Sequence, residues 1–310
     1  MRILFWGTPE FAVPSLRALQ EEGHAVLAVV TQPDRPAGRG QFLRPSPVKQ
    51  EAEREGIPVL QPELPRGEEF ISEIRELEPD LSVVAAYGHI LGDEVLAVPR
   101  LGSINVHASL LPELRGAAPV NWAIIRGHTH SGVTIMRMVR ELDAGPILYR
   151  VATPLPDDIT AGELYEMLSE MGAIGLIEAL AQLEADAITE AEQAHDRATY
   201  APKLGRADAR IDWTLDAVSL DRWIRGCDPW PAAWSQLDGV PVQVFAPRTD
   251  GSVSEQPPGT VLEADPRRGI RVATGDGTLW VGEVKPAGRG RMTSGAWVAG
   301  RGTQEGDRFQ

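Results

Sequence analysis

Cysteine is almost absent from this sequence of 310 residues, which contains a single one, Cys227. One cysteine forms no disulfide within the chain and builds no thiolate metal site, and such scarcity is usual in a reducing cytoplasm. A run of about 18 apolar residues, the minimum for a membrane-spanning helix, is also missing. The N-terminal stretch MRILFWGTPEF has neither the pattern of a secretory signal nor that of a transit peptide. We therefore predict a cytoplasmic protein with no membrane partner.

Three motifs of other enzyme classes are missing as well. The turn around Gly7 lacks the pattern G-x-G-x-x-G, which disfavours a Rossmann-type dehydrogenase. His128 and His130 form an H-x-H pair without a cluster of further ligands, so we expect no metal site. Ser109 lacks the signature of a nucleophile elbow and Cys227 is distant in sequence, so no covalent nucleophile is predicted.

Composition is that of a globular protein, but charge is distributed unevenly. The length suits two domains, and 43% of the residues are hydrophobic and 24% charged. Residues 203–310 contain 14 basic and 14 acidic side chains, which leaves 16 basic and 30 acidic ones in residues 1–202. The balanced second part is a candidate surface for a polyanion, because phosphates need local Lys and Arg rather than a basic total. On charge alone, the alternative that the net charge only keeps the protein soluble has equal weight.

Strands and helices alternate through the first half of the chain. Short apolar runs predict strands, and stretches with helical spacing predict helices. The predicted strands are 2–6, 25–31, 57–60, 81–86, 103–107 and 133–138, and the predicted helices are 13–22, 47–56, 68–77, 118–126 and 160–183. This order predicts an α/β domain with a Rossmann-like, mostly parallel sheet that helices cover on both faces. Ligands of such sheets bind at the carboxyl ends of the strands.

The second part of the chain has a different pattern. Six of the eight tryptophans follow residue 202, and a helix is predicted near 217–226. Short apolar runs separated by Gly, Pro and Asp lie at 240–246, 259–264, 269–275 and 278–284. Such spacing predicts a small β-barrel, here an OB-like one, or a sandwich. We place a first domain at 1–189, a linker at 190–206 and a second domain at 207–310.

The sequence GSINVHASLLPELRG (102–116), followed by ELDAG (141–145), carries the candidate chemistry. Asn105 and His107 are two residues apart on a strand, so they share one face at its carboxyl end. An amide donor and an imidazole suit acyl-type transfer to an amine, with donors for an oxyanion and an Asp–His pair for protons. Taken alone, His107 is more often structural and Asp143 is a turn residue before Gly145.

The order N-x-H (105–107), SLLP-x-x-RG (109–116) and LDAG (142–145) resembles the folate-dependent formyltransferase family. The resemblance implies that the cosubstrate is 10-formyltetrahydrofolate and that the acceptor amine attacks its formyl group directly. It implies that the catalytic residues are Asn105, His107 and Asp143. The residues implied to hold the folate are Ser109, Leu110, Leu111 and Pro112 in one loop and Tyr87, Gly88, Ile90 and Leu91 in the segment AYGHIL (86–91).

Three further stretches resemble the methionyl-tRNA branch of that family. They are FWGTPEFAVPSL (5–16), TQPDRPAGRG (31–40), and a second domain with YAPKL (200–204), RIDW (210–213) and IRGCDPWPAAW (224–234). The resemblance implies that initiator methionyl-tRNA supplies the amine and that loop 32–49 enters its acceptor region. The basic residues of this loop, the implied tRNA contacts, are Arg35, Arg39, Arg44 and Lys49. No coiled-coil pattern stands out, and we expect a monomer.

Two alternatives remain beside this interpretation. A formyltransferase could act on a small amine such as an amino-sugar nucleotide, although loop 32–49 and the second domain disfavour it. A tRNA-binding protein with a retired active site is the other alternative, which the intact trio of Asn105, His107 and Asp143 disfavours.

Overall fold

The computed structural model describes residues 1–37 and 42–310, which form two compact units. The first unit comprises residues 1–119, 130–154 and 165–201, and the second comprises residues 120–129, 155–164 and 202–310. The linear division at 189 and 207 stays a prediction. Within the described residues, no helix combines the length and the apolar character needed to cross a bilayer.

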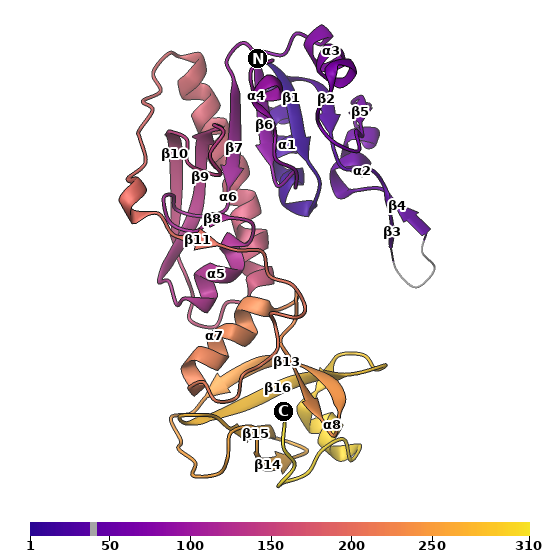
Figure 1. Ribbon diagram of the computed structural model, residues 1–310, viewed down its shortest axis with the longest axis vertical. Coiled ribbons are helices and arrows are strands. Elements are labelled where there is room, and N and C mark those ends of the chain that lie inside the picture. Colours follow the sequence, from indigo (N-terminus) through magenta and orange to yellow (C-terminus); the bar gives the residue numbers. More distant parts are fainter. Residues whose placement is uncertain (38–41) are drawn as a thin grey trace. The chain divides into compact units, whose positions relative to one another are not determined.

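The first unit is built on a seven-stranded sheet in the order β10-β9-β7-β6-β1-β2-β5 (Figure 1). Neighbours from β5 to β7 are parallel, whereas β9 runs antiparallel to both β7 and β10, so the predicted mostly parallel sheet is confirmed. Its strands are β1 (Arg2–Gly7), β2 (Ala25–Val30), β5 (Val59–Leu60), β6 (Leu81–Ala85), β7 (Ser103–His107), β9 (His130–Arg137) and β10 (Ile147–Pro154). No pattern predicted β10, an edge strand whose later residues alternate between half-buried and exposed.

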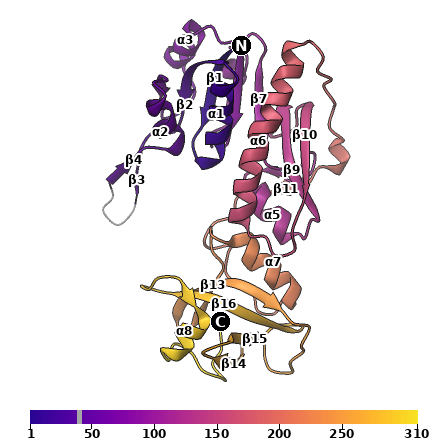
Figure 2. The same ribbon diagram turned by 180° about the vertical axis from the view of Figure 1, so that it is seen from behind.

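Helices cover both faces of this sheet, as predicted. On one face lie α1 (Val13–Glu21) and α6 (Ala161–Glu184) (Figure 2), and on the other lie α3 (Glu68–Glu76) and α4 (Asp93–Leu96). Close approach of α6 needs a glycine, because a Cβ at Gly172 would lie 2.9 Å from Cγ1 of Val106 on β7. Across the sheet, Ile74 of α3 belongs to one buried cluster with Leu4 and Trp6 of β1.

Two predicted helix starts are confirmed in atomic detail. Ser46 precedes α2 (Pro47–Arg54), and its Oγ accepts a 3.1 Å hydrogen bond from the Lys49 amide. Thr160 precedes α6 and forms a capping box, since its amide donates to Oε2 of Glu163 at 2.9 Å and its Oγ1 accepts from the Glu163 amide at 3.3 Å. These caps satisfy amides that have no partner inside the helix.

Short elements complete the first unit. They are β3 (Arg35–Ala37), β4 (Phe42–Arg44), β8 (Arg115–Gly116), β11 (Tyr200–Ala201) and the 3-10 turns Glu10–Ala12 and His195–Arg197. The helix α5 (Pro119–Ile125) belongs, apart from its first residue, to the second unit. β8 and β11 pair in parallel, which ties the end of the predicted linker to the segment that follows β7. The stretch 190–201 is therefore part of the first unit.

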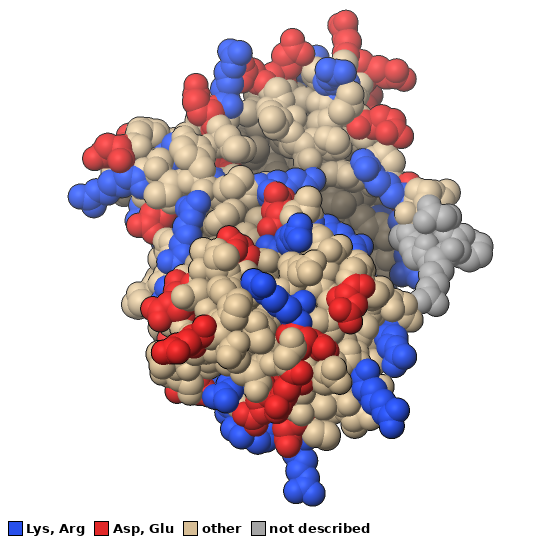
Figure 3. All heavy atoms as spheres, turned by 60° about the horizontal axis from the view of Figure 1, so that its bottom comes forward, with Lys and Arg blue, Asp and Glu red and all other residues tan. Residues whose placement is uncertain are grey.

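The second unit contains the predicted β domain as a six-stranded antiparallel sheet. Its elements are β12 (Trp234–Leu237), β13 (Val240–Thr249), β14 (Val261–Asp265), β15 (Gly269–Ala273), β16 (Thr278–Pro286), β17 (Met292–Thr293), α7 (Ala217–Cys227) and α8 (Ser294–Ala299). Trp213 stacks on Phe309 in its core, with ring centroids 5.5 Å apart. Basic and acidic side chains are intermixed on the face of this unit that Figure 3 brings forward, in keeping with its balanced charge.

The buried cluster around Trp6 gives a test of the fold. Ile74→Ala should lower the free energy of unfolding by about 2–5 kcal/mol, because Ile74 has no exposed surface and truncation leaves a cavity. The matched change Ile174→Ala removes the same atoms from a side chain that is 62% exposed and should alter stability by less than about 0.5 kcal/mol. Urea unfolding followed by circular dichroism measures both, and equal losses would contradict this core.

Candidate active site

The candidate site lies at the carboxyl end of β7. Alternation along this strand turns Val106 toward α6 and places Asn105 and His107 on the opposite face. Asn105 is next to Val84 of β6 in the sheet register, and Val84 belongs to the cluster of Trp6. The predicted shared face of Asn105 and His107, at a strand end, is therefore present.

His107 is buried and close to Asp143. Only 5% of its surface is exposed, and its Nδ1 lies 3.7 Å from Oδ2 of Asp143, an ion-pair rather than a hydrogen-bond distance. Its Nε2 lies 3.0 Å from the carbonyl oxygen of Leu114. Because a carbonyl only accepts, Nε2 carries a proton, and Nδ1 is the nitrogen that faces the carboxylate. The ring is therefore oriented with Nδ1 toward the carboxylate of Asp143.

Asp143 occupies a tight turn between β9 and β10. Its φ of 50° lies in the left-handed region, which aspartate tolerates better than most residues. Its Oδ2 accepts a 2.8 Å hydrogen bond from the Gly116 amide. Gly145 permits the turn to close, because a Cβ there would lie 2.1 Å from the Arg137 carbonyl oxygen. Asp143 is therefore both a turn residue and the carboxylate that approaches His107.

Asn105 differs from His107 in being only half-buried. Within the described residues, its side-chain amide has no hydrogen-bond partner, although its neighbours on β7 are firmly paired to β6 and β9. An amide offers two N–H donors, and here both are available to a ligand at the end of the strand.

Buried hydrogen bonds hold the loop 109–112 in place. Ser109 is 1% exposed and its Oγ donates to the Glu113 carbonyl at 2.6 Å. Thr134 of β9 bridges the loop, since its Oγ1 donates to the Ser109 carbonyl at 2.7 Å and accepts from the Leu111 amide at 3.1 Å. Leu111 is also buried, and its peptide bond to Pro112 is cis. Of the four predicted folate contacts here, Leu110 and Pro112 keep partly exposed side chains.

The segment 87–91 alternates between buried and more exposed residues. Tyr87 and Leu91 belong to the cluster of Trp6, and burial raises the pKa of Tyr87 to about 12. Ile90 is 84% exposed, and Gly88 has a φ of 89° that suits glycine. Two buried polar atoms, Oη of Tyr87 and Nε2 of His89, have no hydrogen-bond partner among the described residues.

Three of the predicted tRNA contacts, Arg35, Arg44 and Lys49, lie in or next to a hairpin that extends from the sheet (Figure 1). Arg35 of β3 and Arg44 of β4 are directly opposite in register, and both are exposed. Lys49 instead forms an ion pair with Asp34, from Nζ to Oδ2 at 2.7 Å, and donates to Oε1 of Gln61 at 2.8 Å. Arg39 lies outside the described residues.

Two buried residues that the sequence analysis did not single out support the Asp143 turn. Arg115 and Gln193 are each 4% exposed, and the guanidinium donates to Oε1 of Gln193 from Nε at 3.1 Å and from Nη2 at 2.6 Å. Nε2 of Gln193 donates to the carbonyl oxygens of Asp143 at 2.9 Å and Gly145 at 2.7 Å. Arg115 was visible as part of the RG motif, whereas Gln193 falls in the stretch interpreted as a linker and carries no motif.

Other groups are less suited to chemistry. Cys227 is buried, and burial raises its pKa to about 12, so it stays a thiol at neutral pH. In the part of the chain that the structure describes, no three His, Cys, Asp or Glu residues are grouped to hold a metal.

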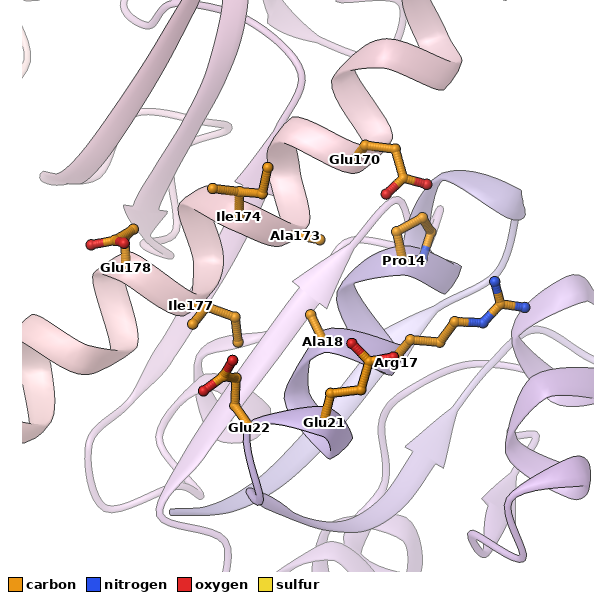
Figure 4. Close-up of a pocket in the computed structure, with 10 residues that line it drawn as sticks. All are labelled: Pro14, Arg17, Ala18, Glu21, Glu22, Glu170, Ala173, Ile174, Ile177 and Glu178. Carbon is orange, nitrogen blue, oxygen red and sulfur yellow. The ribbon is translucent and has the colours of Figure 1, made fainter.

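A hollow between α1 and α6 lies on the sheet face opposite His107. It is lined by Pro14, Arg17, Ala18, Glu21, Glu22, Glu170, Ala173, Ile174, Ile177 and Glu178 (Figure 4).

Comparison with known proteins identifies the family. Residues 1–180 match the formyl transferase family, and residues 203–302 match the C-terminal domain of formyl transferases. The chain belongs to the formyl transferase family. It is 46% identical over 307 residues to the methionyl-tRNA formyltransferase of Bacillus velezensis, a match that covers 99% of this chain and 96% of that protein.

Solved structures share the fold. HypX from Aquifex aeolicus in complex with tetrahydrofolic acid is 21% identical with a TM-score of 0.63, over 96% of this chain and 46% of that one. The chain described here therefore spans about half the length of HypX. An N-formyltransferase from Helicobacter canadensis in complex with folinic acid and dTDP-3-aminofucose is 16% identical with a TM-score of 0.66, over 90% of this chain and 97% of that one.

The bridge made by Thr134 gives a test of the loop. Thr134→Val keeps the shape but removes the hydroxyl, leaving the Leu111 amide without its partner in the protein interior. The free energy of unfolding should fall by about 1–3 kcal/mol. Thr153→Val on neighbouring β10, where the hydroxyl is near the surface, should change it by less than about 0.5 kcal/mol. Comparable urea unfolding curves for the two variants would show that the bridge does not hold the loop.

Proposed function

We propose that this chain transfers the formyl group of 10-formyltetrahydrofolate to the amino group of initiator methionyl-tRNA. The observation that carries the proposal is the 46% identity to a methionyl-tRNA formyltransferase, which extends over 99% of the chain and so includes the second unit. The geometry at the end of β7 supplies groups suited to this reaction, namely free amide donors on Asn105 and a proton-holding pair of His107 and Asp143.

Asn105 and His107 stabilise the transition state in this proposal. The uncharged methionyl amine attacks the formyl carbon, and negative charge grows on the formyl oxygen. The Asn105 amide donates a hydrogen bond to that oxygen, and His107, once it has taken the proton that the amine loses, places positive charge beside it. Preorganised donors of this kind are worth most in a site that excludes water, and His107 is 5% exposed.

Asp143 and His107 handle the protons. The amine loses one proton as its new C–N bond forms, and the folate nitrogen gains one as the old C–N bond breaks. Because Nδ1 of His107 faces the Asp143 carboxylate at 3.7 Å, the pair accepts and returns a proton, directly or through water, and ends the cycle unchanged.

The residues beside this trio fit a folate. The loop 109–112 would border it with the main chain and with the Leu110 and Pro112 side chains, while buried Ser109 and Leu111 keep the loop in shape. In the segment 87–91, the buried Oη of Tyr87 and Nε2 of His89, which have no partner among the described residues, could form hydrogen bonds with a heterocycle or with water.

The hairpin of β3 and β4 suits a polyanion. Like charges directly opposite each other on paired strands are destabilising, so Arg35 and Arg44 do not serve the hairpin itself. Phosphates of the tRNA acceptor end would neutralise both. Lys49 holds Asp34 and Gln61 and so supports the base of the hairpin, and a contact of Arg39 with the acceptor end remains part of the proposal.

The protein is further proposed to act as a cytoplasmic monomer without a metal. Its domains are proposed to be 1–189 and 207–310, joined by a linker at 190–206. The proposed location rests on composition, and the proposed domain bounds rest on the sequence patterns given above.

A formylation assay tests the proposal. Purified protein is mixed with 10-formyltetrahydrofolate and charged initiator methionyl-tRNA, and formyl-methionine is measured. Formylation should be fast, and His107→Ala should lower kcat by about 100- to 1000-fold because it removes a group that stabilises the oxyanion.

Two parallel reactions distinguish the alternatives. Charged elongator methionyl-tRNA should be a much poorer substrate than the initiator. Transfer to an amino-sugar nucleotide but to neither tRNA would instead establish a small-amine formyltransferase. Binding of tRNA without any transfer would indicate a protein that has lost its catalytic role.

The two opposed arginines give a separate test. Arg35→Ala combined with Arg44→Ala should raise KM for methionyl-tRNA and leave KM for the folate unchanged. The dependence of log KM on log salt should become shallower by roughly one per lost phosphate contact. Arg75→Ala, an exposed arginine of α3, is the control and should match wild type. An unchanged salt dependence in the double variant would exclude the hairpin from the tRNA interface.

A further inference from the structure

Gln193 lies deep in the first unit although its neighbours in sequence are exposed. Residues 191, 192, 194 and 195 are all at the surface, whereas Gln193 is 4% exposed. The chain is pinned beside it by a bridge between Ala191 and Ile147, whose amides and carbonyls exchange hydrogen bonds of 2.8 and 2.9 Å. A polar side chain is thereby inserted under the turn that carries Asp143.

Every hydrogen-bonding position of the Gln193 amide is used. Its two N–H groups donate to the carbonyls of Asp143 and Gly145, and its oxygen accepts twice from Arg115. Arginine only donates and carbonyls only accept, so the amide fits in one orientation. A buried group with all its partners in place is rigid, and loss of any one leaves another unsatisfied.

These bonds act on the backbone that determines where the Asp143 carboxylate points. Asp143 has a left-handed backbone, and its side chain reaches the Gly116 amide and His107 from that conformation. Arg115 precedes Gly116 in the chain, so one cluster holds both the turn and the amide that its carboxylate accepts from. Displacement of the turn by a fraction of an ångström would change the 3.7 Å approach to His107.

We propose that Gln193 is a positioning residue for the transfer reaction, which holds the Asp143 turn so that the carboxylate faces Nδ1 of His107. This role rests on the proposed function. Gln193 touches neither substrate, and it acts through the carbonyls of Asp143 and Gly145.

Gln193→Glu is the sharpest test, because it changes one NH₂ group to an oxygen. The new side chain keeps an acceptor for Arg115 but turns an oxygen toward the two carbonyls, which repel it. We expect kcat for formylation to fall roughly 10- to 100-fold, as misplacement of a catalytic group does, with KM for the folate and for methionyl-tRNA nearly unchanged. The pH profile of kcat should also change, since the geometry of the proton-holding pair is altered.

Gln193→Met removes the same donors without burying a carboxylate, and it provides the same measurement if the acidic variant folds poorly. Gln256→Glu, an exposed position in the second unit, introduces the same charge as a control and should behave as wild type. Folded Gln193 variants with wild-type kcat and pH profile, or with losses confined to thermal stability, would overturn the role. Wild-type protein that transfers no formyl group would overturn the proposed function, and this role with it.

Discussion

The approach of a buried imidazole to a carboxylate, His107 to Asp143, is the interaction on which the rest of the site depends. Nδ1 of His107 is directed at Asp143 because its Nε2 is held by the Leu114 carbonyl. Asp143 reaches that point only from a left-handed turn, which a glycine at 145 and the amide of Gly116 make possible. The pair joins the end of β7 to the loop between β9 and β10, two segments that are distant in sequence.

Much of the surrounding structure serves to keep that pair in place. Thr134 and Ser109 fix the loop after β7 from inside, and Arg115 and Gln193 fix the turn of Asp143 from beneath. Both sets use buried, fully paired polar groups, which are rigid because any alternative arrangement leaves a donor or acceptor unsatisfied. Asn105, by contrast, keeps its amide free for the proposed hydrogen bond to the formyl oxygen.

The hairpin that carries Arg35 and Arg44 differs from these buried, hydrogen-bonded groups. It is exposed, and it places two positive charges opposite each other, which disfavours the pairing of β3 with β4. The phosphates of the proposed tRNA partner would offset this repulsion. The rigid site and the charged hairpin thus divide the proposed work between chemistry and recognition.

Several features were determined by the sequence itself. Period-two and period-3.6 patterns are local, so β7, α2, α6 and four strands of the second unit, β13 to β16, were predicted close to their observed bounds, whereas the short strands β12 and β17 were not predicted. Asn105 and His107 share a face because they are two residues apart on a strand, which needs no tertiary information. Only the tertiary structure showed which nitrogen of His107 faces Asp143, that Ser109 and Leu111 point inward, and that Lys49 is committed to Asp34. It also showed that Gln193 is buried beside the Asp143 turn, because hydrogen bonds between residues about 50 positions apart leave no periodic trace in a single sequence.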